Sequence, residues 1–188
     1  MRIIGGSFRG RALASVGKGD AGAHLRPTTD RVRESLFNVL MGGRYGDPIS
    51  DARVLDVFAG TGALGLEALS RGAAHVTFVE GGRKGQSLIR ENIALLKTKE
   101  QSKLFGRDAT RMPVNPDALY DLVFLDPPYG KGLGEAALES ISKSGWIARE
   151  ALILWEENTA IMPPQGCALL ETRSFGGTSI SFLRWNAA

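Results

Sequence analysis

Short apolar runs alternate with stretches of helical spacing through the middle of the chain. Four consecutive apolar residues, Leu122–Leu125, are typical of a strand buried on both faces, as in a parallel sheet. The alternation predicts a parallel α/β sheet with right-handed crossovers and helices on both faces. The expected strands are 53–58, 75–80, 102–106, 121–126 and 152–155, and the expected helices are 63–70, one carrying Ile89, Ile93 and Leu96, and one around 136–142.

Both ends of the chain depart from this rhythm. Residues 1–13 predict a short strand, a glycine turn and a second strand, and segments 168–174 and 179–185 predict an antiparallel hairpin. A terminal hairpin makes the sheet mixed. We therefore expect a Rossmann-like domain over residues 25–188, preceded by a basic appendage over residues 1–24.

One further helix is expected after Pro27, with Thr28 or Thr29 as its cap. Its apolar face would carry Val32, Leu36, Val39 and Leu40, and its other faces would carry Arg31, Arg33, Glu34 and Asn38.

Composition narrows the class of protein. The 188 residues are 43% apolar and 23% charged, which is ordinary for a globular domain. We expect no membrane span, because no apolar run reaches 18 residues, and no secretion signal. A single cysteine, Cys167, and two histidines predict no disulfide and no metal cluster, which favours the reducing cytoplasm.

Positive charge is concentrated at the start of the chain. Residues 1–45 hold eight of the 23 basic side chains but three of the 20 acidic ones. The charge alone fits either a solvated polar face or a patch that contacts phosphate groups, for which arginine is well suited.

A glycine turn marks a nucleotide site. Gly60-x-Gly62-x-x-Gly65 follows an expected strand and opens an expected helix, and Glu80 ends the next strand. This context predicts an adenosine-type cofactor, with Glu80 accepting hydrogen bonds from ribose hydroxyls.

The acids around this turn favour S-adenosylmethionine. Asp56 would repel a pyrophosphate, but it suits a ligand that carries an ammonium and a sulfonium group. Asp108, after the third strand, could accept from the adenine amine. The other interpretations are a loop-capping acid at Asp56 and a simple turn aspartate at Asp108.

The second candidate site is the corner Asp126-Pro127-Pro128-Tyr129. The prolines stop the strand, and Pro127 keeps Asp126 extended. A carboxylate, a carbonyl and an aromatic ring would thus lie at the carboxyl edge of the sheet, where ligands bind in open α/β folds.

These motifs resemble a known family. Asp56-x-Phe58-x-Gly60-x-Gly62 with Asp126-Pro-Pro-Tyr129 resembles the amino-group methyltransferases. The blocks Met1–Gly6 and Arg26–Asn38 resemble the bacterial 16S ribosomal RNA guanine-N2 methyltransferases, and the resemblance runs from Met1 to Trp185. It implies a seven-stranded class I methyltransferase fold, an N-terminal hairpin that grips RNA, and methylation of one guanine. One departure is Gly81-Gly82-Arg83, where the family pattern has a polar residue and an acid.

The motifs and the resemblance together give a set of expected site residues. The chain would act as a monomer on 16S rRNA or a small-subunit assembly intermediate, with S-adenosylhomocysteine as product and without a metal. Expected catalytic residues are Asp126, Pro127 and Tyr129; cofactor residues are Asp56, Phe58, Ala59, Gly60, Thr61, Gly62, Glu80, Asp108 and Ala109; RNA contacts are Arg9, Arg11, Arg26, Thr28 and Arg31.

Three rival functions remain open. The Asp126-Pro-Pro-Tyr129 motif is also typical of DNA adenine-N6 and cytosine-N4 methyltransferases, although 188 residues leave no room for an extra target-recognition segment. An NAD-dependent oxidoreductase would use the same glycine turn. A non-catalytic RNA-binding or assembly factor would not need Asp126.

Overall fold

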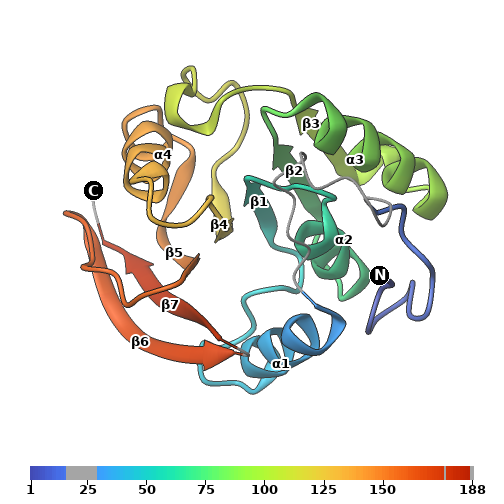
Figure 1. The fold of residues 1–188 in the computed structure, drawn as a ribbon, viewed down its shortest axis with the longest axis horizontal. Helices are drawn as coiled ribbons and strands as arrows, with labels where there is room; N and C mark the ends of the chain where they lie inside the picture. Colours follow the sequence, from blue (N-terminus) through green and yellow to red (C-terminus); the bar gives the residue numbers. More distant parts are fainter. Residues whose placement is uncertain (16–28, 176, 187–188) are drawn as a thin grey trace.

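The computed structural model describes residues 1–15, 29–175 and 177–186, which form a seven-stranded mixed sheet (Figure 1). The strands are β1 (Arg53–Val57), β2 (His75–Val79), β3 (Ser102–Phe105), β4 (Tyr120–Leu125), β5 (Ile147–Glu157), β6 (Cys167–Phe175) and β7 (Thr178–Trp185). Their order is β3-β2-β1-β4-β5-β7-β6. The first five run parallel, and β7 lies antiparallel between β5 and β6. The expected α/β sheet with a closing hairpin is confirmed.

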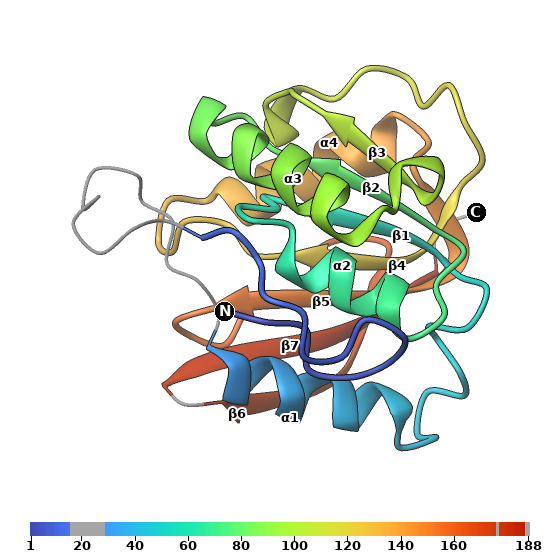
Figure 2. The ribbon, with the colours of Figure 1, turned by 90° about the vertical axis from the view of Figure 1, so that its right-hand side faces the viewer.

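Helices cover both faces of this sheet. α1 (Asp30–Met41), α2 (Ala63–Ser70) and α3 (Arg83–Leu96) pack on one face, in front of the sheet in Figure 2. α4 (Leu133–Lys143) and the short 3-10 helix η3 (Ala109–Arg111) pack on the other, and a second 3-10 helix, η2 (Lys99–Gln101), precedes β3. Among the described helices, none combines the length and apolar character needed to cross a membrane.

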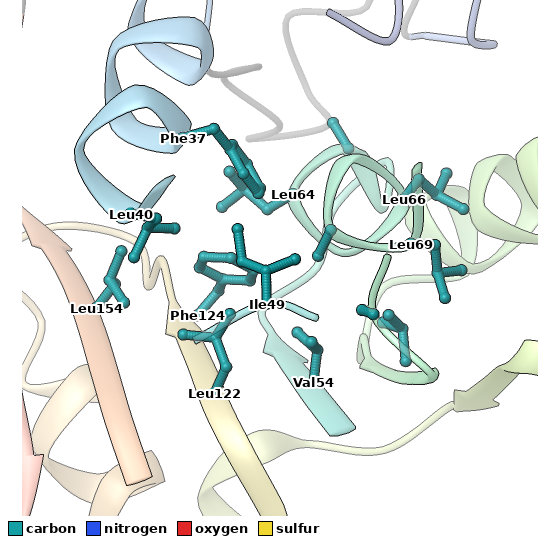
Figure 3. Close-up of a cluster of buried hydrophobic side chains, with 14 of the residues drawn as sticks. Phe37, Leu40, Ile49, Val54, Leu64, Leu66, Leu69, Leu122, Phe124 and Leu154 are labelled. Atoms are coloured by element: carbon teal, nitrogen blue, oxygen red, sulfur yellow. The ribbon is translucent and has the colours of Figure 1, made fainter. Parts of the chain in front are cut away.

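Alternating side chains divide the core into two layers. Leu122 and Phe124 of β4 pack toward α1 and α2, whereas Val123 and Leu125 pack toward α4. Figure 3 shows the first layer, where the ring of Phe37 lies 5.8 Å from that of Phe124, centroid to centroid. Fully burying an apolar side chain of this size contributes about 1.5–3 kcal/mol. The two layers therefore hold β4 firmly in the middle of the sheet.

Two elements begin several residues before their expected starts, and the ends of the other strands agree to within one residue. β5 begins at Ile147 rather than 152, because a bulge interrupts its apolar pattern: Glu150 has a φ of 62°, and the register with β4 shifts there. α4 begins at Leu133 because Gly132, with a φ of 65°, starts it, and because Gly134 lets it approach Trp155. A Cβ on Gly134 would lie 2.3 Å from the indole.

The N-terminal arm, residues 1–15, turns back on itself, but a single antiparallel bridge between Arg2 and Ala12 replaces the two expected strands. Ile3 exchanges backbone hydrogen bonds across the arm, but the N–H groups of the next two residues, Ile4 and Gly5, donate to the Glu67 carboxylate of α2 at 2.8 Å each. The arm is thus fixed to the body of the protein.

Glu67 is the centre of a buried ionic network. Its side chain is fully buried, and besides the arm it accepts from Arg71 Nε at 2.8 Å. Arg33 of α1 lies 3.8 Å away and is also fully buried. The expectation that Arg33 faces away from the core is therefore wrong, because a carboxylate inside the fold gives its guanidinium a partner.

Asn92 of α3 binds the far end of the arm. Its Oδ1 accepts from Ala14 N–H at 2.7 Å, and its Nδ2 donates to the carbonyls of Ala14 at 3.1 Å and Thr61 at 2.9 Å. Since Thr61 belongs to the glycine turn, one buried side chain ties the arm to that turn.

Replacing Glu67 with alanine should be strongly destabilising. It leaves Arg33 buried with fewer partners and frees two arm N–H groups, so we expect the free energy of unfolding to fall by about 3–5 kcal/mol. Equilibrium unfolding in denaturant measures this change in the free energy of unfolding. As a control, Glu139→Ala removes an exposed pair with Lys143 and should cost less than about 1 kcal/mol. Equal effects of the two substitutions would contradict the role given to Glu67.

Candidate active site

The glycine turn follows β1 directly. Phe58 has a φ of 60°, a left-handed conformation that a non-glycine residue rarely adopts, and Gly60 and Gly62 also have positive φ values. The turn is closed by the Gly62 N–H, which donates to the Ala59 carbonyl at 2.7 Å, and Gly62 then starts α2. Backbone of this shape is typical of a loop built around a ligand.

The third glycine of the motif brings α2 close to the sheet. A Cβ on Gly65 would lie 2.6 Å from side-chain atoms of both Val76 and Phe78. The Gly65 N–H donates to Asp56 Oδ2 at 2.9 Å, so this buried carboxylate caps the start of α2. The loop-capping interpretation of Asp56 therefore describes one of its roles, and its contact with a cofactor ammonium stays a prediction.

Glu80 lies in a ring of glycines. Its carboxylate accepts from the N–H groups of Gly60 at 2.8 Å and Gly82 at 2.6 Å. A Cβ would come within 2.9 Å of it at Gly82 and 2.8 Å at Gly85. Gly82 thus has a local explanation, because its N–H binds the acid that the motif requires and a Cβ there would crowd that carboxylate, whereas a Cβ on Gly81 would meet only ordinary contacts. The sequence offered no comparable sign of the importance of Gly85.

Asp108 and Ala109 follow β3 at the same edge. Asp108 is exposed, and its Oδ1 accepts from the Thr110 backbone N–H at 2.9 Å and hydroxyl at 2.8 Å. These two hydrogen bonds lower the pKa of the carboxyl below its usual range. Ala109 is buried beneath it. Asp108 therefore shapes its own turn, and its contact with adenine stays a prediction.

The Asp126 corner lies next to the glycine turn. β1 and β4 are parallel neighbours with Val57 opposite Leu125, and the Asp126 N–H donates to the Val57 carbonyl at 3.3 Å. The half-buried Asp126 side chain and the buried Pro127 thus follow β4 where Phe58 follows β1. The structure brings together the two motifs that lie more than sixty residues apart in the chain.

Acidic side chains crowd this edge. Burial raises the pKa of the Asp126 carboxyl well above its usual range, and the charges of Glu156 and Asp56 raise it further. Burial likewise raises the pKa of Asp56 to about 7; the Gly65 N–H opposes that shift and the charge of Glu80 adds to it. A bound cation would relieve this repulsion.

Tyr129 is held by residues that the motif analysis missed. Its hydroxyl donates to Glu156 Oε1 at 2.5 Å and lies 2.9 Å from Thr178 Oγ1, while the Gly130 N–H donates to Glu157 Oε1 at 3.1 Å. A sign was present in the sequence: Glu156 and Glu157 come directly after the strand expected at 152–155, so they share the carboxyl edge with Asp126.

Some of the residues expected to contact RNA lie within the described residues and others lie outside them. Arg9 and Arg11 are exposed on the arm, with the Arg11 guanidinium 5.5 Å from the centre of the Phe8 ring. Arg31 is exposed in the first turn of α1. Arg26 and Thr28 lie outside the described residues. Trp146 and Trp155 are fully buried packing residues.

A hollow opens on the opposite, amino-terminal edge of the sheet, lined by Asp47, Asp121, Glu150 and Arg184 among others. Two of the carboxylates that line it already accept backbone hydrogen bonds: Asp47 accepts from the Ser50 N–H, and Asp121 accepts from the Arg53 N–H. Within the described ranges, no His, Cys, Asp and Glu side chains gather in a group that could hold a metal ion. The candidate site is therefore the carboxyl edge.

Comparison with known proteins agrees with this assignment. A family model described as Conserved hypothetical protein 95 matches residues 1–184. The Ribosomal RNA small subunit methyltransferase D of Escherichia coli (strain K12) is 43% identical over 156 residues, which cover 83% of this chain and 74% of the relative. Its namesake from Haemophilus influenzae is 37% identical over 182 residues, covering 94% and 89%. The solved structure of YhhF from Escherichia coli superposes with a TM-score of 0.83 at 38% identity, covering 100% of this chain and 99% of that one. The chain therefore belongs to the Conserved hypothetical protein 95 family, with these small-subunit ribosomal RNA methyltransferases among its relatives.

Proposed function

We propose that this protein transfers a methyl group from S-adenosylmethionine to the exocyclic N2 amine of one guanine in small-subunit (16S) ribosomal RNA. The single observation that carries the proposal is the hydrogen bond from the Asp126 N–H to the Val57 carbonyl, which joins the amine-binding corner to the cofactor turn. The names of the relatives supply the substrate class.

The residues at the glycine turn fit S-adenosylmethionine. Each Glu80 oxygen accepts one backbone N–H and keeps a lone pair for a ribose hydroxyl. Asp56 would face the ammonium group, and Asp108 keeps Oδ2 for the adenine amine. When bound, the cofactor supplies an electrophilic methyl on a sulfonium. Its two positive charges match the repelling carboxylates of Asp56 and Asp126, whereas the pyrophosphate of NAD would add to the repulsion.

The Asp126 corner would prepare the amine for attack. The lone pair of a guanine amine is delocalised into the ring, so it is a poor nucleophile. The Asp126 carboxylate and the Pro127 carbonyl would accept its two N–H bonds and direct the lone pair toward the methyl group; the gain comes from orientation and placed charge. Because burial and neighbouring charges raise its pKa, Asp126 is also suited to take the released proton.

The half-buried Tyr129 ring would stack on the target base. A base must leave its stack to reach such a pocket, and bases in RNA loops are already splayed. Stacking on an aromatic ring contributes about 1–3 kcal/mol.

The N-terminal arm would contact RNA phosphates. Arg9, Arg11 and Arg31 are exposed, and the contacts of Glu67 and Asn92 fix the arm beside the glycine turn. We assign residues 1–24 to this appendage and residues 25–188 to the catalytic domain. A monomer in the cytoplasm, with rRNA or an assembling subunit as partner, stays part of the proposal.

Substitution of Asp126 should abolish most turnover. We expect Asp126→Asn and Asp126→Ala to lower kcat by about a hundredfold or more, as loss of a placed catalytic group does, while S-adenosylmethionine still binds through the glycine turn and Glu80. Methyl incorporation into unmodified small-subunit rRNA and calorimetric cofactor titration measure the two effects. The control is Asp121→Asn, at the other end of β4, which should be near wild type. Near-normal turnover of both Asp126 variants would refute the proposed role, and methylation of duplex DNA alone would favour the DNA methyltransferase.

Removing the arm's arginines should weaken RNA binding through lost phosphate contacts. For Arg9→Ala with Arg11→Ala, the slope of log K against log salt should fall by about 0.7–0.9 per lost contact. Filter binding over a salt series measures it. The matched pair Lys143→Ala with Arg149→Ala removes two exposed charges remote from the arm and should leave the slope unchanged. If both pairs behave alike, the arm is not at the interface.

A further inference from the structure

Tyr129 is attached at both ends. Its backbone follows the two prolines, and its hydroxyl binds groups on two other strands, Glu156 of β5 and Thr178 of β7. Thr178 Oγ1 also lies 3.1 Å from the same Glu156 oxygen, so its single proton can go to that oxygen or to the Tyr129 hydroxyl oxygen. Two side chains from two other segments therefore meet around one carboxylate oxygen of β5.

The backbone beside the ring is held in the same way. The Gly130 N–H donates to Glu157, the residue next to Glu156. β5 pairs with β4 so that Trp155 lies opposite Leu125, which puts Glu156 beside Asp126. Two consecutive residues of the loop after β4 are thus tied to two consecutive residues at the end of β5.

Glu156 is an unfavourable choice for stability alone. It is 9% exposed, and within the described residues no salt bridge includes it. Its hydrogen-bond donors are neutral hydroxyls, and its charge is one of those that raise the pKa of Asp126. A buried carboxylate without a cationic partner costs folding free energy, and such residues are expected where function requires them.

We propose that Glu156 is a positioning residue that fixes the plane of the Tyr129 ring for the incoming base, and that Thr178 extends this hold to the β6–β7 hairpin. The inference rests on the proposed function, in which Tyr129 stacks on the target guanine. A ring held at its hydroxyl and its backbone has little freedom left to lose when a base stacks on it, so the platform is preorganised. A phenylalanine could stack equally well but could not be held.

Kinetics on rRNA test the proposal. We expect Tyr129→Phe and Glu156→Ala each to lower kcat/KM for RNA by about fivefold, the lower end of the range for one base–aromatic stack, because the ring stays and only its hold is lost; cofactor affinity should be unchanged. Glu156→Gln, which keeps an acceptor, should lose less than Glu156→Ala. The double variant Tyr129→Phe with Glu156→Ala should be as active as the less active of the two single variants, because both substitutions remove the same interaction. Multiplying losses would overturn the proposal.

The hairpin provides a matched control. Thr178→Val should lower kcat/KM for RNA, whereas Thr172→Val, whose hydroxyl pairs with Ser181 on the same hairpin, should not. Equal effects of the two substitutions would overturn the part assigned to Thr178.

A second measurement does not depend on activity. Burial and the bond to Glu156 raise the pKa of the Tyr129 phenol above its usual value, so Glu156→Ala should shift its titration to lower pH. NMR of the protein labelled with ¹³C-tyrosine follows the titration of each of its three tyrosines, and the signal that is missing in Tyr129→Phe belongs to Tyr129. An unchanged titration would overturn the Glu156 contact. If the wild type transfers no methyl group to rRNA, the proposed function fails, while this titration still decides whether Glu156 holds the ring.

Discussion

The parallel pairing of β1 with β4 is the constraint on which the rest of the structure depends. Parallel neighbours about 4.8 Å apart end at the same edge, so the glycine turn and the Asp126 corner face one another without any long-range loop to join them. The two apolar layers keep β4 in register. A slip of one residue would turn Asp126 to the other face of the sheet, so packing far from the site maintains its geometry.

The same edge gathers charges of one sign. Asp56, Asp126 and Glu156 are all largely buried or half-buried. Burial raises the pKa values of Asp56 and Asp126, and neighbouring carboxylates raise them further: Glu80 for Asp56, and Glu156 with Asp56 for Asp126. Most folds avoid such crowding because it costs stability. Under the proposed function the cost has a use: a surface that repels anions and attracts cations would favour a sulfonium cofactor over a dinucleotide that the same glycine turn could otherwise hold.

Much of this could be predicted from the sequence, because the elements that position the site are specified locally. Apolar runs predicted the parallel strands, and glycines and prolines marked the two turns. The missed features come from contacts between distant segments. Arg33 occupies a polar position of its helix but is drawn inside by Glu67 on another helix. Gly85 is required by Glu80, and β5 is longer than its apolar pattern because of the bulge at Glu150. Glu156 could have been found by applying the shared-edge argument to every strand.

The attachment of the arm limits how its function can be studied. Glu67 is fully buried and uses two N–H groups of the arm as partners, so the arm completes the ionic interior as well as carrying exposed arginines. Truncation of the first fifteen residues would strip a buried carboxylate of two of its donors and open the core above α2. A shortened protein that failed to bind RNA would thus reveal a folding defect, and only side-chain substitutions can separate recognition from architecture.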